Sequence, residues 1–76
     1  MAVTNLRAVV RTPNPAVQTL VELVQAEYAE MPGLSVTLPQ AQRLWAVDRV
    51  TCEEAFSRLI ARRVLRKTTQ GRFVRV

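Results

Sequence analysis

The chain has 76 residues, a formal net charge of +5, one cysteine and no histidine. This length allows a single domain, and the composition excludes a disulfide framework, the usual zinc ligand sets and catalysis by a histidine base. No apolar segment approaches the roughly 20 residues of a membrane-spanning helix, and the first residues do not resemble a secretion signal. We therefore expect a cytoplasmic protein without a membrane segment.

The charge is distributed unevenly along the chain. Residues 1–40 sum to −1 and residues 41–76 to +6, and no acidic residue follows Glu54. The basic residues beyond that position are Arg58, Arg62, Arg63, Arg66, Lys67, Arg72 and Arg75. A one-sided basic segment indicates a polyanionic partner, although a solvated face that keeps a small protein in solution has the same composition.

The first predicted helix follows a short N-terminal segment. We expect residues 1–13 to form an arm and residues 14–76 to form the domain. Asn14 is a suitable cap, and Pro15 suits the first helical position because its missing N–H costs nothing there. Apolar residues then recur at the i, i+3, i+4, i+7 spacing of one buried face until a Pro-Gly pair ends the helix. This face comprises Val17, Leu20, Val21, Val24, Tyr28 and Met31, widened by Leu23.

A short strand and a second helix are predicted next. Residues 34–38 alternate between apolar and hydroxyl side chains, as in a half-buried strand. Thr37 or Leu38 lies near the cap position of a helix that Pro39 opens and that continues to about residue 47. Its inward-facing residues are expected to be Ala41, Leu44 and Trp45. A helix this short depends on tertiary packing.

The third predicted helix spans about residues 48–62. Asp48 is a good N-cap, and Arg62 and Arg63 near the other end complement the helix dipole. Apolar spacing again predicts one buried face. Its members are Cys52, Ala55, Phe56, Leu59 and Ile60. On this face the single cysteine is expected to be an inert core thiol rather than a redox sensor.

The chain closes with a predicted hairpin. Two β-prone segments, residues 64–68 and 72–76, flank the sequence TQG, in which Gly71 can supply the positive φ of a tight turn. The strand at residues 34–38 can pair with this hairpin and cover one of its edges. The sequence therefore predicts an α+β fold of three helices with a small antiparallel sheet.

The second half of the chain carries a set of residues at characteristic spacing. They are Ala41, Val47, Asp48, Thr51, Cys52, Phe56, Leu59, Val64, Leu65, Gly71, Arg72, Phe73 and Val74. With these residues and this element order, residues 15–76 resemble the winged helix-turn-helix superfamily of DNA-binding domains, in which the hairpin is called the wing. The family often has a left-handed glycine just before the wing. This chain has Arg63 there, which costs about 1 kcal/mol or more if the geometry is kept.

The resemblance implies a small transcriptional regulator that binds double-stranded DNA. The third helix would enter the major groove, and the wing, residues 64–76, would reach the backbone or the adjacent minor groove. The side chains placed to contact DNA would be Gln40, Gln42, Arg43, Arg49, Val50, Glu53, Glu54, Ser57, Lys67, Thr68, Thr69, Gln70 and Arg72. Arg49 would contact guanine through two hydrogen bonds, worth roughly 1–3 kcal/mol of base discrimination, or would be a solvated side chain near Asp48.

The two glutamates of the third helix admit three interpretations. They could accept hydrogen bonds from cytosine, orient arginines, or repel phosphates. For Glu54 we favour the structural role, because Arg58 follows it at the favourable i, i+4 spacing. For Glu53 the choice between base readout and repulsion stays open.

Other function classes receive less support from the residues. No nucleophile with a base, paired catalytic carboxylates or phosphate loop is visible, so we expect no enzyme activity, cofactor, metal or small-molecule ligand. The same fold can serve as a protein-interaction module that docks through the third helix, and a basic tail can associate with RNA or a ribosome. A homodimer, if one forms, would use the arm at residues 1–13 or the first helix.

Overall fold

The structure is a computed structural model that describes residues 15–76. The predicted arm at residues 1–13 and the predicted cap Asn14 lie outside the described residues. The elements in chain order are α2 (Pro15–Glu30), β1 (Val36–Thr37), α3 (Leu38–Leu44), α4 (Arg49–Ala61), β2 (Leu65–Lys67) and β3 (Arg72–Arg75). Residues 15–76 therefore form the predicted α+β arrangement of three helices and a small antiparallel sheet.

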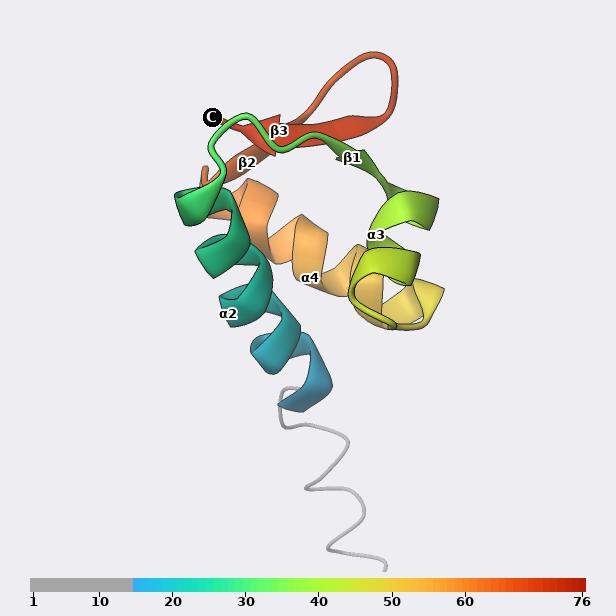
Figure 1. The fold of residues 1–76 in the computed structure, drawn as a ribbon. Coiled ribbons are helices and arrows are strands. Elements are labelled where there is room, and N and C mark those ends of the chain that lie inside the picture. The colour runs from blue at the N-terminus through green and yellow to red at the C-terminus, as the bar shows by residue number, and fades with distance from the viewer. Residues whose placement is uncertain (1–14) are drawn as a thin grey trace, which may run out of the picture.

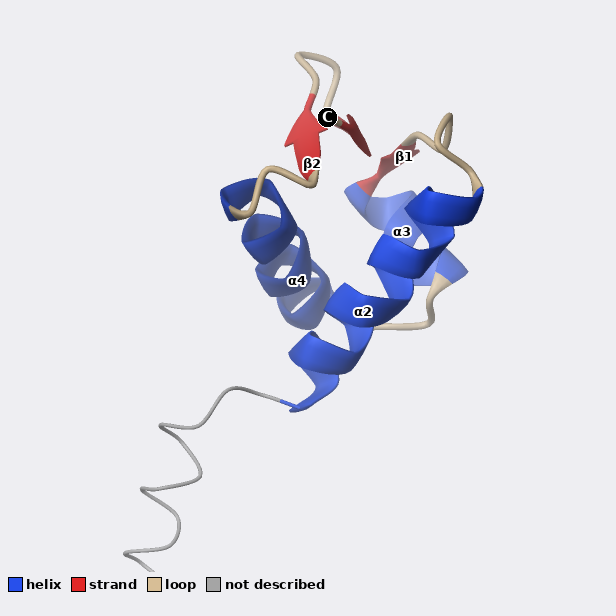
Figure 2. Cartoon of the chain, turned by 90° about the vertical axis from the view of Figure 1, so that its left-hand side faces the viewer, coloured by secondary structure: helices blue, strands red, loops and turns tan. Residues whose placement is uncertain are grey.

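The helices and the sheet enclose one hydrophobic core. In Figure 1, α2 and α3 lie on either side of α4, and the sheet lies across one end of the three helices. Figure 2 shows that β2 follows directly above the C-terminal end of α4. The largest fully buried side chains are Tyr28, Phe56, Leu59, Leu65, Val21, Val24 and Cys52. Within the described chain no helix is long and apolar enough to cross a membrane.

Helix α2 buries the predicted face, with two corrections. Val17, Leu20, Val21, Val24 and Tyr28 are buried as predicted. Leu23 is exposed because it lies about 120° around the helix from the centre of that face, at about 100° per residue. Met31 is exposed because the helix ends at Glu30 and the chain turns away. The buried face of α2 therefore ends with Tyr28.

Helix α3 begins with a capping box. The Thr37 hydroxyl accepts a hydrogen bond from the Gln40 N–H, and the Gln40 side chain accepts one from the Thr37 N–H. These reciprocal bonds satisfy donors at the helix start. The helix ends at Leu44, short of the predicted residue 47, and the Leu44 side chain is 56% exposed. Leu44 is therefore not inward-facing as predicted, whereas Trp45, at i+4 from the buried Ala41, faces inward as predicted, with its ring centroid 6.1 Å from that of Phe56.

Helix α4 carries its cap and most of its core face as predicted. The Asp48 carboxylate accepts a hydrogen bond of 3.1 Å from the Thr51 N–H. Hydrogen bonds from the Thr51 side chain and main chain lower the pKa of Asp48 below its usual 3.8. Burial, with smaller contributions from the charges of Glu53 and Asp48, raises the pKa of the Cys52 thiol to about 11. The thiol is buried and stays protonated near neutral pH, as expected of an inert core cysteine.

Helix α4 ends in a left-handed residue that is not glycine. Arg63 has φ 62°, the Arg63 N–H donates to Ile60 O, and the Val64 N–H donates to Leu59 O over 2.9 Å. This pair of bonds is the Schellman arrangement that closes a helix. The left-handed geometry is therefore kept at Arg63, at a cost of roughly 1–2 kcal/mol for a residue with a Cβ.

Helix α3 ends in a related way. Ala46 has φ 53°, and the Val47 N–H donates to Gln42 O over 3.0 Å. The turn between α3 and α4 therefore reverses at a left-handed alanine, where glycine is the usual residue. This turn sets the relative direction of the two helices.

The sheet has the order β1-β3-β2, so the last strand lies in the middle. Phe73 is paired with Val36 on one side and with Lys67 on the other. The strands are shorter than predicted, since the ladder covers only residues 36–37, 65–67 and 72–75. Gly71 has φ 79°, as the predicted hairpin turn requires. The strand predicted at residues 34–38, which is β1, thus pairs with β3 rather than with β2.

Candidate nucleic-acid interface

One side of α4 is free of core packing and carries polar and apolar groups. Arg49, Val50, Glu53 and Ser57 are all exposed, with Arg49 at 73% and Val50 at 72%. At about 100° per residue these four positions fall within an arc of about 100° on the helix. The structure therefore brings together four of the side chains predicted to contact DNA.

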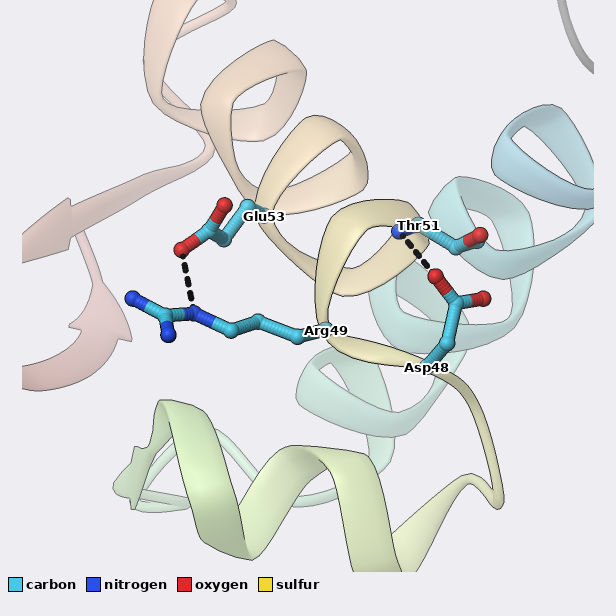
Figure 3. Close-up of polar contacts among 4 residues, drawn as sticks. All are labelled: Asp48, Arg49, Thr51 and Glu53. Carbon is cyan, nitrogen blue, oxygen red and sulfur yellow. Dashed lines mark hydrogen bonds and ion pairs between the residues drawn. The ribbon is translucent and has the colours of Figure 1, made fainter.

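The Arg49 and Glu53 side chains contact each other along this side of α4. The Arg49 Nε donates a hydrogen bond of 3.0 Å to Glu53 Oε2, and the two groups form an ion pair. Figure 3 shows both side chains together on one side of the helix, away from the contact between Asp48 and Thr51. Glu53 therefore points at an arginine of its own helix.

Glu54, about 100° around α4 from Glu53, makes a different contact. Its Oε2 lies 3.7 Å from Arg58 Nη2, at the predicted i, i+4 spacing. Arg58 is half-buried, with a side chain that is 30% exposed. This geometry agrees with the structural role favoured for Glu54. The four charged residues of α4 thus form two ion pairs, and their formal charges cancel.

A groove separates α4 from the β2–β3 hairpin. It has a volume of about 480 Å³, and its walls come from α4, the start of α3 and the hairpin. The lining residues are Thr37, Leu38, Pro39, Glu53, Phe56, Ser57, Ile60, Lys67, Gln70, Gly71 and Phe73. Predicted contact residues from two elements far apart in the sequence therefore line one groove together with apolar side chains.

The basic residues of the hairpin are divided between the two faces of the sheet. Lys67 pairs with the buried Phe73, and its Nζ lies 5.7 Å from the centroid of the Phe73 ring, within range of a cation–π contact. Arg66 pairs with Val74 on the opposite face. Arg72 is half-buried and donates through Nη1 to the Ser35 main-chain oxygen. Lys67 is thus the hairpin cation beside α4, and Arg72 serves partly to tie the hairpin to the segment before β1.

The hairpin loop is organised by Thr68. Its hydroxyl accepts hydrogen bonds from the Gln70 and Arg72 N–H groups, over 3.3 and 3.1 Å. This leaves the side chains of Thr69 and Gln70 exposed at the tip. Thr68 therefore has a structural role in the loop, while its two neighbours are accessible to a partner.

The three α3 residues predicted to contact DNA do not line the groove. The Gln40 side chain is occupied by the capping box, Gln42 is half-buried and Arg43 is exposed. None of the three lines the groove. Of these three, Arg43 has the exposed charge that a phosphate contact needs.

Sequence reasoning missed three apolar members of the groove. Ile60 was expected in the core but is 36% exposed and lines the groove with Leu38 and Pro39. The helical spacing contained a signal, because Ile60 lies within about 20° of Arg49 and of Glu53 on the α4 wheel at about 100° per residue. Apolar spacing alone assigned it to the adjacent buried face.

This arrangement offers hydrogen-bond donors, acceptors, a cation and apolar contacts, but no set of metal ligands. Within residues 15–76 no three histidine, cysteine or acidic side chains are grouped to hold a metal ion. No family model, no curated protein and no solved structure matches the chain.

Proposed function

We propose that residues 14–76 form a winged helix-turn-helix domain that binds double-stranded DNA, as a small transcriptional regulator. In this proposal α4 enters the major groove, and the β2–β3 hairpin is the wing, which contacts the backbone or the adjacent minor groove. One observation carries the proposal. Arg49, Val50, Glu53 and Ser57 lie on one exposed side of α4, beside a groove that the hairpin borders.

The chemistry of that side is suited to base edges. Arginine donates to guanine, a valine methyl contacts the methyl of thymine, and serine bonds to either kind of base. None of these side chains is needed for the core, which α4 contacts through the buried Thr51, Cys52, Ala55, Phe56 and Leu59. The proposed base contacts therefore cost the domain no packing.

Attachment to the phosphates would come mainly from outside α4, because the charges of that helix cancel. Lys67 beside the groove and the exposed Arg43 are the proposed phosphate contacts. Thr69 and Gln70 at the hairpin tip would add neutral hydrogen bonds. Arg72 would contribute charge while its Nη1 stays bonded to the Ser35 oxygen.

The proposal is tested by titrating a labelled duplex of random sequence at two salt concentrations. Affinity should fall steeply as salt rises, because bound cations release counterions from DNA. Arg49→Ala and Arg58→Ala form a matched pair, since both arginines lie on α4 in an i, i+4 ion pair but on opposite sides of the helix. We expect Arg49→Ala to weaken binding and Arg58→Ala to leave it nearly unchanged. Absence of binding at low salt rejects the proposal.

A protein-interaction module is the second candidate, and two observations favour it. The charges of α4 cancel, and two aliphatic side chains, Val50 and Leu44, are largely exposed on the two adjacent helices. Such a surface suits a protein partner better than a basic helix would. The double variant Arg49→Ala, Lys67→Ala separates the two candidates. It should abolish DNA binding, whereas docking through Val50 and Leu44 should persist and depend little on salt.

A further inference from the structure

We propose that Glu53 is a positioning residue for Arg49, which it holds in the orientation that contacts guanine. This inference rests on the proposed DNA binding and deepens it. Glu53 would act through Arg49, without contacting a base or a phosphate itself. It would raise the selectivity of the domain for particular sequences while adding nothing to its general affinity for DNA.

The geometry of the ion pair supports this role. Glu53 Oε2 accepts from Nε of Arg49, which is the nitrogen nearest the aliphatic part of the side chain. Among the described residues none accepts from the two terminal nitrogens of Arg49. These two nitrogens form the end of the guanidinium fork and together can donate to O6 and N7 of one guanine. The contact with Glu53 thus leaves the guanine-binding end of the fork free and restricts its direction.

Helix stability does not account for the pair. Both side chains are largely exposed, at 73% and 48%, and exposed ion pairs contribute little to folding. Arginine also precedes glutamate in the chain, which is the less favourable order along a helix, and a cation in the first turn opposes the helix dipole. Asp48 already caps this end of α4. The pair is therefore better explained by the orientation it imposes on Arg49.

The second ion pair of α4, between Glu54 and Arg58, differs in residue order, in exposure and in distance. Glu54 precedes Arg58 in the favourable order, and Arg58 is half-buried at the other side of the helix. Its nearest oxygen–nitrogen distance, 3.7 Å, is longer than the 3.0 Å between Arg49 and Glu53. Glu54 is accordingly the matched control for Glu53, because it carries the same charge on the adjacent position of the same helix.

The experiment begins with duplexes enriched by the wild-type protein from a randomised pool. Dissociation constants are then measured for the enriched duplex and for a scrambled duplex with the wild type, Glu53→Ala, Glu53→Gln and Glu54→Ala. We expect Glu53→Ala to reduce the ratio of the two constants roughly fivefold or more, as loss of a good bidentate base contact does. Glu53→Gln keeps an oxygen acceptor and should lose less. Glu54→Ala should leave the ratio unchanged.

Replacing guanines of the enriched duplex by 7-deazaguanine removes the N7 acceptor and tests the partner of Arg49. The wild type should lose affinity at one of these guanines, whereas Arg49→Ala and Glu53→Ala should lose little further. Thermal melting of each variant verifies that it is folded.

Three results would overturn the inference. If Glu53→Ala binds both duplexes more tightly with an unchanged ratio, Glu53 only repels phosphates. If selectivity depends on a cytosine and not on guanine N7, Glu53 reads a base directly. A wild-type protein that binds duplexes with no preference overturns this inference alone, whereas one that binds no duplex even at low salt overturns the proposed function as well.

Discussion

The hydroxyl of Tyr28 donates a hydrogen bond of 2.6 Å to the main-chain oxygen of Phe73, 45 positions later in the chain. Tyr28 is the last buried residue of α2, and Phe73 lies in the central strand. The Phe73 ring in turn packs against Phe56 of α4, with their centroids 4.5 Å apart. This pair of residues therefore joins the first described helix to the sheet and, through Phe56, to the helix proposed to read DNA.

Replacing Tyr28 by phenylalanine should destabilise the domain without opening a cavity. The variant keeps the ring but removes the donor to a buried carbonyl, and a loss of about 1–2 kcal/mol is expected. In a domain of this size that loss lowers Tm by roughly 5–15 °C. Thermal unfolding followed by circular dichroism measures it. An unchanged Tm would show that the hydrogen bond contributes nothing net.

Ionisation of Tyr28 should be shifted to high pH. Burial raises its pKa to about 12 from the ordinary 10.0. Because the folded pKa is the higher one, this contribution to stability is complete below pH 10 and is lost as the pH rises through about 12. Tyr28 is the single tyrosine of the chain, so the ultraviolet absorbance of tyrosinate reports on it alone. Titration at the ordinary pKa in folded protein would contradict this prediction.

Replacing Arg63 by glycine should stabilise the domain. Glycine relieves the left-handed strain at φ 62°, and after the entropy cost of glycine we expect a gain of about 0.5–1 kcal/mol in the free energy of unfolding. Arg62→Gly is the matched control, since it removes the same charge at a residue with φ −86°. The control should lose about 0.5–1 kcal/mol. Urea unfolding measures both, and a change of the same sign in both would count against the strain.

The helix cap at Asp48 should give the domain an acid-sensitive contribution to stability. Its pKa is lowered in the folded state, so the contribution is complete above the usual value of 3.8 and is lost as the pH falls through the lower folded value. Asn also caps helices but does not titrate in this range. The difference in stability between the wild type and Asp48→Asn should therefore depend on pH only below about 4, because the other acids titrate equally in both. A stability difference between the two proteins that stays constant from neutral to acid pH would contradict the prediction that Asp48 stabilises the domain through its charge.

Two neighbouring cations of β2 should differ in their contribution to DNA binding. Lys67 borders the groove beside α4, whereas Arg66 lies on the opposite face of the sheet. If DNA lies along α4 and the groove, Lys67→Ala should make the logarithmic dependence of affinity on salt shallower by about one, and Arg66→Ala should leave the slope unchanged. Equal effects of the two substitutions would place the DNA elsewhere on the hairpin.

The elements of the fold were largely predictable because local signals and tertiary packing agree. The Asp48 cap, the apolar spacing of α4 and the glycine of the hairpin each indicate one structure, and the structure contains all three. The inward position predicted for Leu44 was wrong because a short helix is oriented by its neighbours, here through the contact between Trp45 and Phe56. The role of Gln40 could have been found, since Thr37 and Gln40 form the spacing of a capping box.

The candidate site was less predictable than the fold. The residue types were visible, but the groove depends on how close the hairpin approaches α4, which no local pattern specifies. The direction of Glu53 was open because an exposed glutamate has several rotamers of similar energy. The i, i+4 spacing had indicated the pair of Glu54 with Arg58, whereas the pair of Glu53 with Arg49 was not predicted and is seen only in the three-dimensional arrangement.

The central position of β3 has a consequence for the order in which the domain forms during synthesis. A nascent chain that has reached only Gly71 contains β1 and β2 but lacks the strand that lies between them, and it also lacks the acceptor for Tyr28. The sheet cannot form until residues 72–75 have left the ribosome. Until then, α2 also lacks the hydrogen bond between Tyr28 and Phe73 that joins it to the sheet. Folding should therefore be a single cooperative event that follows synthesis of β3, with no stable intermediate built from the helices alone.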